Sequence, residues 1–265
     1  MTSPQDESGV SHASGELPNG APGARISYIL PVHNSAPFLR NVVETLVGRL
    51  RADGGRAEIF LIENGSTDDS WRTATDIARD LSSPEVLVAA DRTAKGMGNA
   101  YRRGMELATG ELLVLTAADL PFGFTDLDSY LRAEPAPEIA IGSKGHPESR
   151  VRVARLRRLM SFGFRTWTRL LLGLRLRDTQ GTILLRREVA DEVSPHLACS
   201  DFLIATEIVA WSVRHGRRPV ELPVVYEQAP RPSTVAPLVD AWRMARGTVE
   251  LRRRLHSQAL DGSAA

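Results

Sequence analysis

The chain has a single cysteine, Cys199, in 265 residues, and lysines at only two positions, Lys95 and Lys144. One thiol excludes an intramolecular disulfide framework and a metal cluster built from cysteines. The sequence therefore fits a reducing compartment, and we expect a cytoplasmic protein. Because the other 31 basic residues are all arginine, the two lysines are candidates for specific roles.

Long apolar runs and a large net charge are also missing. No stretch approaches the ~18 apolar residues that span a bilayer, and the longest apolar patch, 170–174, is flanked by Arg169 and Arg175. The net charge of +1 argues against a general polyanion binder, and no recognised nucleic-acid-binding motif is present. With 42% hydrophobic residues, the chain has the composition of a globular protein with a substantial core.

Three segments follow from the composition. Residues 1–24 are rich in Ser, Gly, Pro and Ala and lack the apolar core of a signal peptide, which predicts a disordered tail. Residues 25–230 alternate strand-like and helix-like patterns, and 231–265 predict a basic C-terminal helix and tail. Strands are predicted at 26–30, 58–62, 86–89, 111–115, 138–141, 182–185 and 220–225, and helices at 38–50, 69–81, 98–108, 151–174, 202–215 and 237–255. Strands separated by helices predict an α/β domain with a mostly parallel sheet flanked by helices.

Polar segments follow four of the predicted strands. They are Pro31-Val-His33-Asn34-Ser35, Glu63-Asn64-Gly65-Ser66-Thr67-Asp68, Lys95-Gly96-Met97-Gly98-Asn99 and Ala117-Ala118-Asp119. Ligands of a parallel sheet bind beyond the carboxyl ends of its strands. We therefore expect carboxylate, amide and cationic groups to meet at one edge and form a binding site.

The ordered set of segments resembles family 2 glycosyltransferases, in particular the polyprenyl-phosphate mannosyl- and glucosyltransferases. Those enzymes carry P-x-Y-N-E, D-D-G-S-x-D, G-K-G-x-A-x-x-x-G and D-A-D-L in this order. Later blocks agree as well, with Gly142-Ser143-Lys144 for G-S-R and Asp178-Thr179-Gln180-Gly181 for D-T-Q-C-G. The resemblance covers about Ile26 to Val225 and implies a GT-A fold, with a Rossmann-like nucleotide-sugar half and an acceptor half.

The resemblance also implies roles for individual residues. The donor nucleotide sugar would be held by Pro31, His33, Asn34, Glu63, Asn64, Ser66, Asp68, Lys95, Gly96, Asn99 and Ala118. Gly96 and Gly98 would allow close backbone approach. Asp119 would help to hold Mg²⁺ or Mn²⁺ against the donor diphosphate, while Asp178 and Gln180 would shape the sugar pocket or, for Asp178, complete the metal environment.

Three departures from the family pattern reduce the number of carboxylates. Ala117 stands at the first acidic position of the D-x-D motif, Glu63-Asn64 replaces the usual double Asp, and Ser35 replaces Glu. Metal binding then depends on Asp119, with donor phosphates and water supplying the other ligands. We expect an inverting hexosyl transfer from a UDP- or GDP-sugar, and the alternative of a catalytically idle nucleotide-sugar-binding protein stays open.

Two acceptors are compatible with the sequence. A polyprenyl phosphate would be held by Lys144, Arg150 and Arg155, because basic side chains match phosphate. The segment Arg150–Arg177 contains nine Arg and no acidic residue, with an apolar stripe at helical spacing. This stripe either contacts a membrane surface, which would make the protein peripheral, or packs against the sheet with its arginines solvated. A small soluble metabolite is the other acceptor.

Overall fold

The computed structural model describes residues 25–152, 155–227 and 237–261, and for 155–162, 227, 237–242 and 258–261 it describes the backbone alone. The predicted tail, residues 1–24, lies outside the described residues. So do 231–236 and 262–265 of the predicted C-terminal segment.

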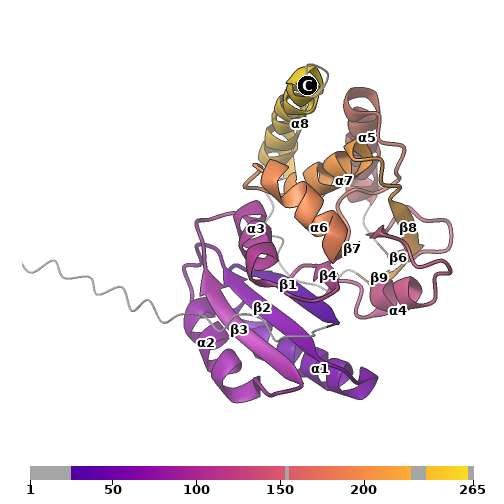
Figure 1. Ribbon diagram of the computed structural model, residues 1–265. Coiled ribbons are helices and arrows are strands. Elements are labelled where there is room, and N and C mark those ends of the chain that lie inside the picture. The colour runs from indigo at the N-terminus through magenta and orange to yellow at the C-terminus, as the bar shows by residue number, and fades with distance from the viewer. Residues whose placement is uncertain (1–24, 153–154, 228–236, 262–265) are drawn as a thin grey trace, which may run out of the picture.

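A seven-stranded sheet in the order β3-β2-β1-β4-β7-β5-β8 forms the centre of the protein (Figure 1). β7 is antiparallel to both of its neighbours, and the other adjacent strands pair in parallel. The predicted mostly parallel sheet is therefore confirmed. Its strands are β1 (Ile26–Val32), β2 (Ala57–Glu63), β3 (Val86–Arg92), β4 (Leu112–Leu115), β5 (Ile139–Ser143), β7 (Ile183–Arg186) and β8 (Val220–Pro223), and a separate parallel pair is formed by β6 (Arg150–Arg152) and β9 (Val225–Glu227).

Helices cover both faces of the sheet. One face packs against α1, α2 and α4, and the other against α3, α6 and α7. The helices are α1 (Ala36–Asp53), α2 (Ser70–Leu81), α3 (Met97–Leu107), α4 (Thr125–Leu131), α5 (Arg155–Leu172), α6 (Arg187–Val193), α7 (Ile204–Arg214) and α8 (Pro237–Asp261), with a 3₁₀ turn at Ser194–His196.

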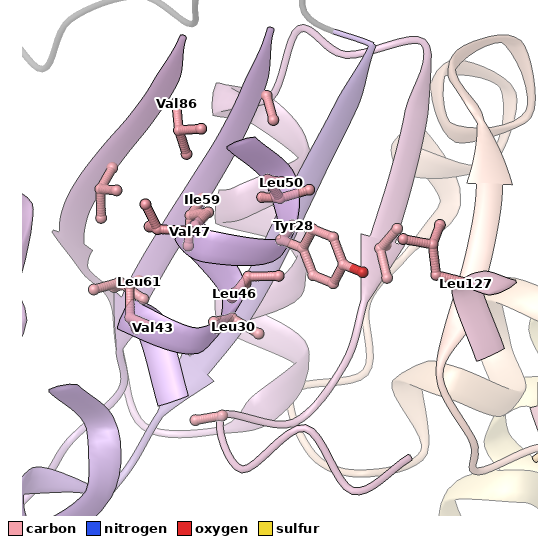
Figure 2. Packing of buried hydrophobic residues seen from close by; sticks show 14 of the residues in the cluster. Tyr28, Leu30, Val43, Leu46, Val47, Leu50, Ile59, Leu61, Val86 and Leu127 are labelled. Carbon is pink, nitrogen blue, oxygen red and sulfur yellow. The ribbon is translucent and has the colours of Figure 1, made fainter. Parts of the chain in front are cut away.

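The central strands are apolar on both faces, as strands between two helical layers must be. In β1, Tyr28 and Leu30 belong to the core that faces α1, whereas Ile29 belongs to the core on the opposite face. Figure 2 shows Tyr28 and Leu30 beside Leu46 and other residues of α1. Every residue of β2 is buried. This double burial fixes the register, because a shift by one residue would exchange the two faces.

Two predicted elements are corrected. The predicted helix 151–174 begins only at Arg155, because β6 (Arg150–Arg152) pairs with β9 before it. The predicted strand 220–225 is divided into β8 and β9, since Val224 N donates to Ser149 Oγ at 2.9 Å. Both differences come from contacts about 75 residues apart in the chain, which local periodicity does not report. The short helices α4 and α6 were not predicted either.

Helices α5 and α8 lie together on the side of the sheet away from β1–β3 (Figure 1). Trp167 Nε1 donates to Ala245 O at 3.3 Å across this pair, and Leu251 of α8 is fully buried against α7 and β5. The C-terminal helix therefore packs on the domain. Among the described residues, no helix is both long and apolar enough to cross a membrane.

Gly104 shows how closely α3 packs on the sheet. A Cβ atom at Gly104 would lie 2.2 Å from Ile29 Cγ2 of β1. We expect Gly104→Ala to lower the free energy of unfolding by about 1–3 kcal/mol, because the core must shift to admit the methyl group. Chemical denaturation measures this. Gly48→Ala is the matched control: its Cβ would meet nothing within 4 Å, and we expect it to raise stability by ~0.5–1 kcal/mol. Equal effects of the two variants would contradict this packing.

Candidate active site

The strand directions bring all the predicted site segments to one edge of the sheet. Strands β1 to β4 end at this edge, β5 and β8 end there too, and the antiparallel β7 begins there. Thr116 Oγ1 lies 2.9 Å from Thr182 Oγ1, which joins the exit of β4 to the entry of β7. Adjacent strands lie about 4.8 Å apart. The exits of β1, β2 and β3 therefore form one half of the edge, and the exits of β4 and β5, with the start of β7 between them, form the other.

Asn34 ties the loop after β1 to the loop after β2. Its backbone is left-handed, with φ of 50°, a conformation that asparagine tolerates better than most residues. Asn34 N donates to Ser66 Oγ at 3.1 Å, and Asn34 Oδ1 accepts from Thr67 N at 2.9 Å. These bonds join two of the predicted nucleotide-binding segments.

Asp68 stabilises the same pair of loops. Its carboxylate accepts from Ser70 N at 3.0 Å and from Ser70 Oγ at 2.5 Å, and Ser70 Oγ accepts from Ser35 N at 2.7 Å. Burial alone would raise the pKa of Asp68, but the hydrogen bonds from Ser70 and Ala36 outweigh it and lower that pKa. The carboxylate thus organises the start of α2.

Glu63 lies at the end of β2 with both carboxylate oxygens engaged. Oε1 accepts from Ser66 N at 2.5 Å, and Oε2 lies 3.3 Å from Arg92 Nε. The Arg92 guanidinium stacks over the Trp71 ring at 4.2 Å. Neither Arg92 nor Trp71 was predicted. The parallel register, in which Glu63 faces Arg92, is the signal that could have found the arginine.

Both ends of the Asn64 side-chain amide are hydrogen-bonded to the protein's own backbone. The side chain is buried; Nδ2 donates to Val32 O at 3.0 Å, and Oδ1 accepts from Gly96 N at 3.3 Å. The predicted contact of Asn64 with the nucleotide is therefore replaced by an indirect role, in which Asn64 holds the loop after β3.

Gly96 and Gly98 are closely approached by the protein's own backbone. A Cβ at Gly96 would lie 2.1 Å from Ser200 O, and one at Gly98 would lie 2.1 Å from Cys199 O. Gly98 N donates to Ser200 O at 2.9 Å. The approach that these glycines permit in the structure is that of the segment 198–200, and their predicted approach to the donor stays a prediction.

The loop that contains these glycines presents Lys95 to solvent. Asn99 closes it by donating from Nδ2 to Lys95 O at 3.0 Å and Ala94 O at 3.3 Å. Asn99 Oδ1 accepts from Arg102 at 2.5 Å. In the structure Asn99 therefore shapes the loop, and its predicted contact with the nucleotide stays a prediction. The Lys95 side chain is exposed.

The turn after β4 carries Asp119 on its surface. Ala118 is buried, Asp119 is exposed, and Leu120 adopts a left-handed φ of 44°. Leu120 N donates to Ala117 O at 3.0 Å and closes the turn. A left-handed leucine is a local strain that persists only where the surroundings hold it, and such strain is concentrated at functional sites.

Asp119 has the right character for a cation shared with a substrate. Within residues 25–152, 155–227 and 237–261 no group of three or more His, Cys, Asp or Glu residues could hold a metal ion. Mg²⁺ is commonly held by one or two carboxylates together with substrate phosphates and water. One exposed carboxylate fits this mode and does not fit an all-protein cage.

The opposite half of the edge contains an ion pair between two predicted site residues. Lys144 Nζ lies 3.1 Å from Asp178 Oδ2, and Lys144 N donates to the same oxygen at 3.2 Å. Gln180 N donates to Asp178 Oδ1 at 2.9 Å, and Gln180 Nε2 donates to Thr206 Oγ1 at 2.8 Å. The structure thus brings Lys144, Asp178 and Gln180 together, as the prediction requires.

Glu221, at the end of the sheet, holds this pair in place. Its Oε1 accepts from Ser143 Oγ at 2.6 Å, Arg177 N at 3.0 Å and Asp178 N at 3.1 Å. The sequence pattern does not predict this role, because Glu221 and its partners come from three separate parts of the chain, at 143, 177–178 and 221.

The remaining predicted residues are less closely tied to the site. His33 is half-buried, and its buried Nδ1 atom has no hydrogen-bond partner among the described residues. Pro31 is a residue of β1 paired in register with Ile62. Arg150 is exposed on β6, and the side chain of Arg155 lies outside the described residues.

Comparison with known proteins identifies the fold and the family. The sequence profile of glycosyl transferase family 2 matches residues 27–193. The chain is a family 2 glycosyltransferase. It is 23% identical over 248 residues to the dolichyl-phosphate beta-glucosyltransferase of Saccharomyces cerevisiae, covering 86% of this chain and 74% of that protein. The human protein of the same name is 25% identical over 204 residues, covering 71% and 63% respectively.

A solved structure shares the fold. Glucosyl-3-phosphoglycerate synthase from Mycobacterium tuberculosis, in complex with Mn²⁺, UDP-glucose and phosphoglyceric acid, superposes with a TM-score of 0.60 at 20% identity, covering 88% of this chain and 80% of that one. The central mostly parallel sheet flanked by helices is therefore a GT-A fold, as the sequence predicts. The same synthase has also been crystallised with Mg²⁺ and UDP.

Asp126 lies at the start of α4, and its side chain is buried. The effect of this burial on stability can be tested. Burial raises the pKa of Asp126, against hydrogen bonds from Thr182 and Leu127 N that lower it. Because the pKa of Asp126 is higher in the folded state, its neutral carboxyl contributes fully to stability below the unfolded pKa of about 3.9. This contribution is lost as the pH rises through the folded pKa and the buried carboxyl ionises. We expect Asp126→Asn to be more stable than the parent near pH 7, with the difference vanishing below about pH 4.

Denaturant unfolding across this pH range measures that difference. Asp128→Asn is the control, because Asp128 lies 2.6 Å from Arg49 Nη2 and its loss removes an ion pair. The control is expected to lower stability at neutral pH. A pH-independent difference between Asp126→Asn and the parent would contradict the assignment.

Proposed function

We propose that the chain transfers a hexose from a UDP- or GDP-sugar to a polyprenyl phosphate, with inversion at the anomeric carbon. Glucose is the sugar in the names of the two relatives described above, and UDP-glucose is present in the synthase complex. The observation that carries the proposal is the order of groups along one edge: Glu63 and Lys95 on one side, Asp119 in the middle, and the Lys144–Asp178 pair on the other.

The donor would lie across the exits of β3, β2 and β1. The Glu63 carboxylate can accept from a base N–H or a ribose hydroxyl, and Lys95 can approach the diphosphate, which is the strongest negative charge of the donor. His33 Nδ1, which is buried without a described partner, is available for one further hydrogen bond. Arg92, stacked on Trp71, partly neutralises Glu63 and so limits the negative charge that faces the nucleotide.

Asp119 would hold a divalent cation together with the donor diphosphate. When bound, such a cation neutralises the charge that develops on the departing nucleoside diphosphate. Because Ala117 leaves a single carboxylate in this turn, we infer that the free protein binds the cation weakly and that the donor contributes most of its ligands.

The acceptor phosphate would lie beside Lys144. One phosphate oxygen attacks the anomeric carbon as the bond to the diphosphate breaks, and the nucleoside diphosphate leaves on the opposite face. A phosphate is already anionic at neutral pH, so orientation matters more than a general base. Lys144 pairs with Asp178 when no acceptor is present and is positioned to share its charge with the phosphate.

The principal test is sugar transfer into the organic phase. Labelled UDP- and GDP-sugars are incubated with Mn²⁺ or Mg²⁺ and a short polyprenyl phosphate. We expect transfer from one donor, and a loss of about 100-fold or more in kcat for Asp119→Ala, because charge stabilisation of the leaving group is removed. Asp191→Asn, an exposed carboxylate of α6, is the control and should retain activity. Transfer by Asp119→Ala at the parent's rate would exclude the role given to Asp119.

A soluble phosphate-bearing acceptor is the second candidate, and the fold shared with glucosyl-3-phosphoglycerate synthase favours including it. The same assay with 3-phosphoglycerate separates the two, because the product then stays in the aqueous phase. Donor-dependent thermal stabilisation without any transfer would instead favour a nucleotide-sugar-binding protein.

A lipid acceptor requires contact with a membrane, and the α5–α8 pair presents suitable side chains. Leu170 is 73% exposed and Trp167 is 38% exposed on α5. Arg169 and Arg175, near them in the chain, are exposed, and so are Arg243 and Arg252 of α8. Exposed apolar side chains among basic residues are typical of helices that lie in an anionic membrane interface.

We expect the protein to float with anionic liposomes at low salt and less so at high salt, because the electrostatic part is screened. The double variant Trp167→Ser, Leu170→Ser should float markedly less. Leu131→Ser is the matched control, since Leu131 is 56% exposed on α4. Equal flotation of the double variant and the control would remove α5 from the membrane contact.

A further inference from the structure

The carboxylate of Glu207 in α7 is completely buried. It accepts hydrogen bonds from Cys199 N at 2.8 Å and Ala198 N at 3.1 Å, and it forms an ion pair with Arg254 Nη1. A buried carboxylate is tolerated only when it is paired and hydrogen-bonded. Glu207 therefore holds the segment 198–200 on one side and depends on Arg254 on the other.

Arg254 comes from the C-terminal helix α8. Besides Glu207, it donates from Nη2 to Cys199 Sγ at 3.4 Å. Its neighbours Leu251 and Leu255 pack into the apolar clusters formed with α7 and β5, so the backbone that carries Arg254 is itself anchored. The guanidinium is thus a fixed partner for Glu207.

The segment 198–200 forms one wall of the Lys95 loop. Ser200 O accepts from Gly98 N at 2.9 Å, and the carbonyls of Cys199 and Ser200 leave no room for a Cβ at Gly98 or Gly96. On its other side the loop is held by the bond from Gly96 N to Asn64 Oδ1. If the segment 198–200 moves, the loop 94–99 must therefore move with it.

We propose that Arg254 and Glu207 are positioning residues through which α8 sets the conformation of the loop 94–99. The effect on catalysis rests on the proposed function, in which Lys95 approaches the donor diphosphate. Neither residue touches the donor. Loss of Arg254 leaves the buried charge of Glu207 without its partner, which displaces the segment 198–200 and releases Gly98.

The test compares Arg254→Met, Arg254→Lys and the control Arg253→Met, whose side chain is exposed on the same helix. Hydrogen exchange is measured for the amides of 94–100, 198–200 and β2. UDP and GDP binding with Mn²⁺ is measured by calorimetry, and KM for the donor is separated from kcat. For Arg254→Met we expect about tenfold faster exchange in 94–100 and 198–200, unchanged exchange in β2, and about tenfold weaker nucleotide binding.

The split between the kinetic constants distinguishes positioning from a general loss of stability. We expect the donor KM to rise while kcat changes by less than about twofold, because the loop contributes to binding the donor. Arg254→Lys keeps a positive charge beside Glu207 and should restore most of the affinity. If Arg254→Met does not fold, Arg254→Lys and Glu207→Gln keep the side-chain volume and should show the same local exchange at smaller amplitude.

Two results would overturn the proposal: exchange in 94–100 of Arg254→Met that matches that of Arg253→Met, or faster exchange that extends equally to β2. If the parent protein binds no nucleotide, the proposed function fails. The exchange data then still decide whether α8 positions the loop.

Discussion

The pairing of β1 with β2 on one side and β4 on the other is the constraint on which the rest of the protein depends. β1 is buried on both faces and paired on both edges, so its register cannot shift without moving apolar side chains into the wrong layer. This pairing sets the exits of three strands side by side. The loops that leave them then satisfy one another's backbone groups through Asn34, Asn64 and Asp68.

Several polar residues that resemble ligand-binding residues in sequence thus serve to build the loops. The side chains of Asn64 and Asn99 donate hydrogen bonds to neighbouring backbone carbonyls. The Asp68 carboxylate accepts from Ser70 N at the start of α2. Fewer groups are left: the side chains of Lys95 and Asp119 are exposed, while Glu63 and the Lys144–Asp178 pair are already engaged in ion pairs. A binding site of this kind is prearranged by its surroundings, which lowers the cost of ordering it when a ligand binds.

Charge is balanced in pairs along the same edge. Glu63 faces Arg92, and Asp178 faces Lys144, so Asp119 is the carboxylate of the central turn that is exposed to solvent. An exposed carboxylate between two ion pairs would be a weak cation site by itself and a better one beside a diphosphate. Ala117 removes one acid from the D-x-D motif, and ion pairs engage Glu63 and Asp178. Both features leave fewer carboxylates for a cation at this edge.

The sequence by itself determined the order of the main strands and helices, the edge of the sheet at which the polar segments lie, and the family. Apolar periodicity reports which residues face a core, and the polar segments after Val32, Glu63 and Leu115 lie beyond parallel strands whatever the details of packing. The prediction that Asp119 is the remaining carboxylate of the D-x-D motif comes from the family resemblance.

Only the tertiary structure decided which polar groups are consumed within the protein. The contact of Arg92 with Glu63, the role of Glu221, the β6–β9 pair and the link from Arg254 to Gly98 join segments that are distant in the chain. Local propensity carries no record of such contacts, because each depends on how whole elements pack. For that reason the sequence predicted the edge that carries the candidate site but did not distinguish the side chains that build its loops from those left exposed.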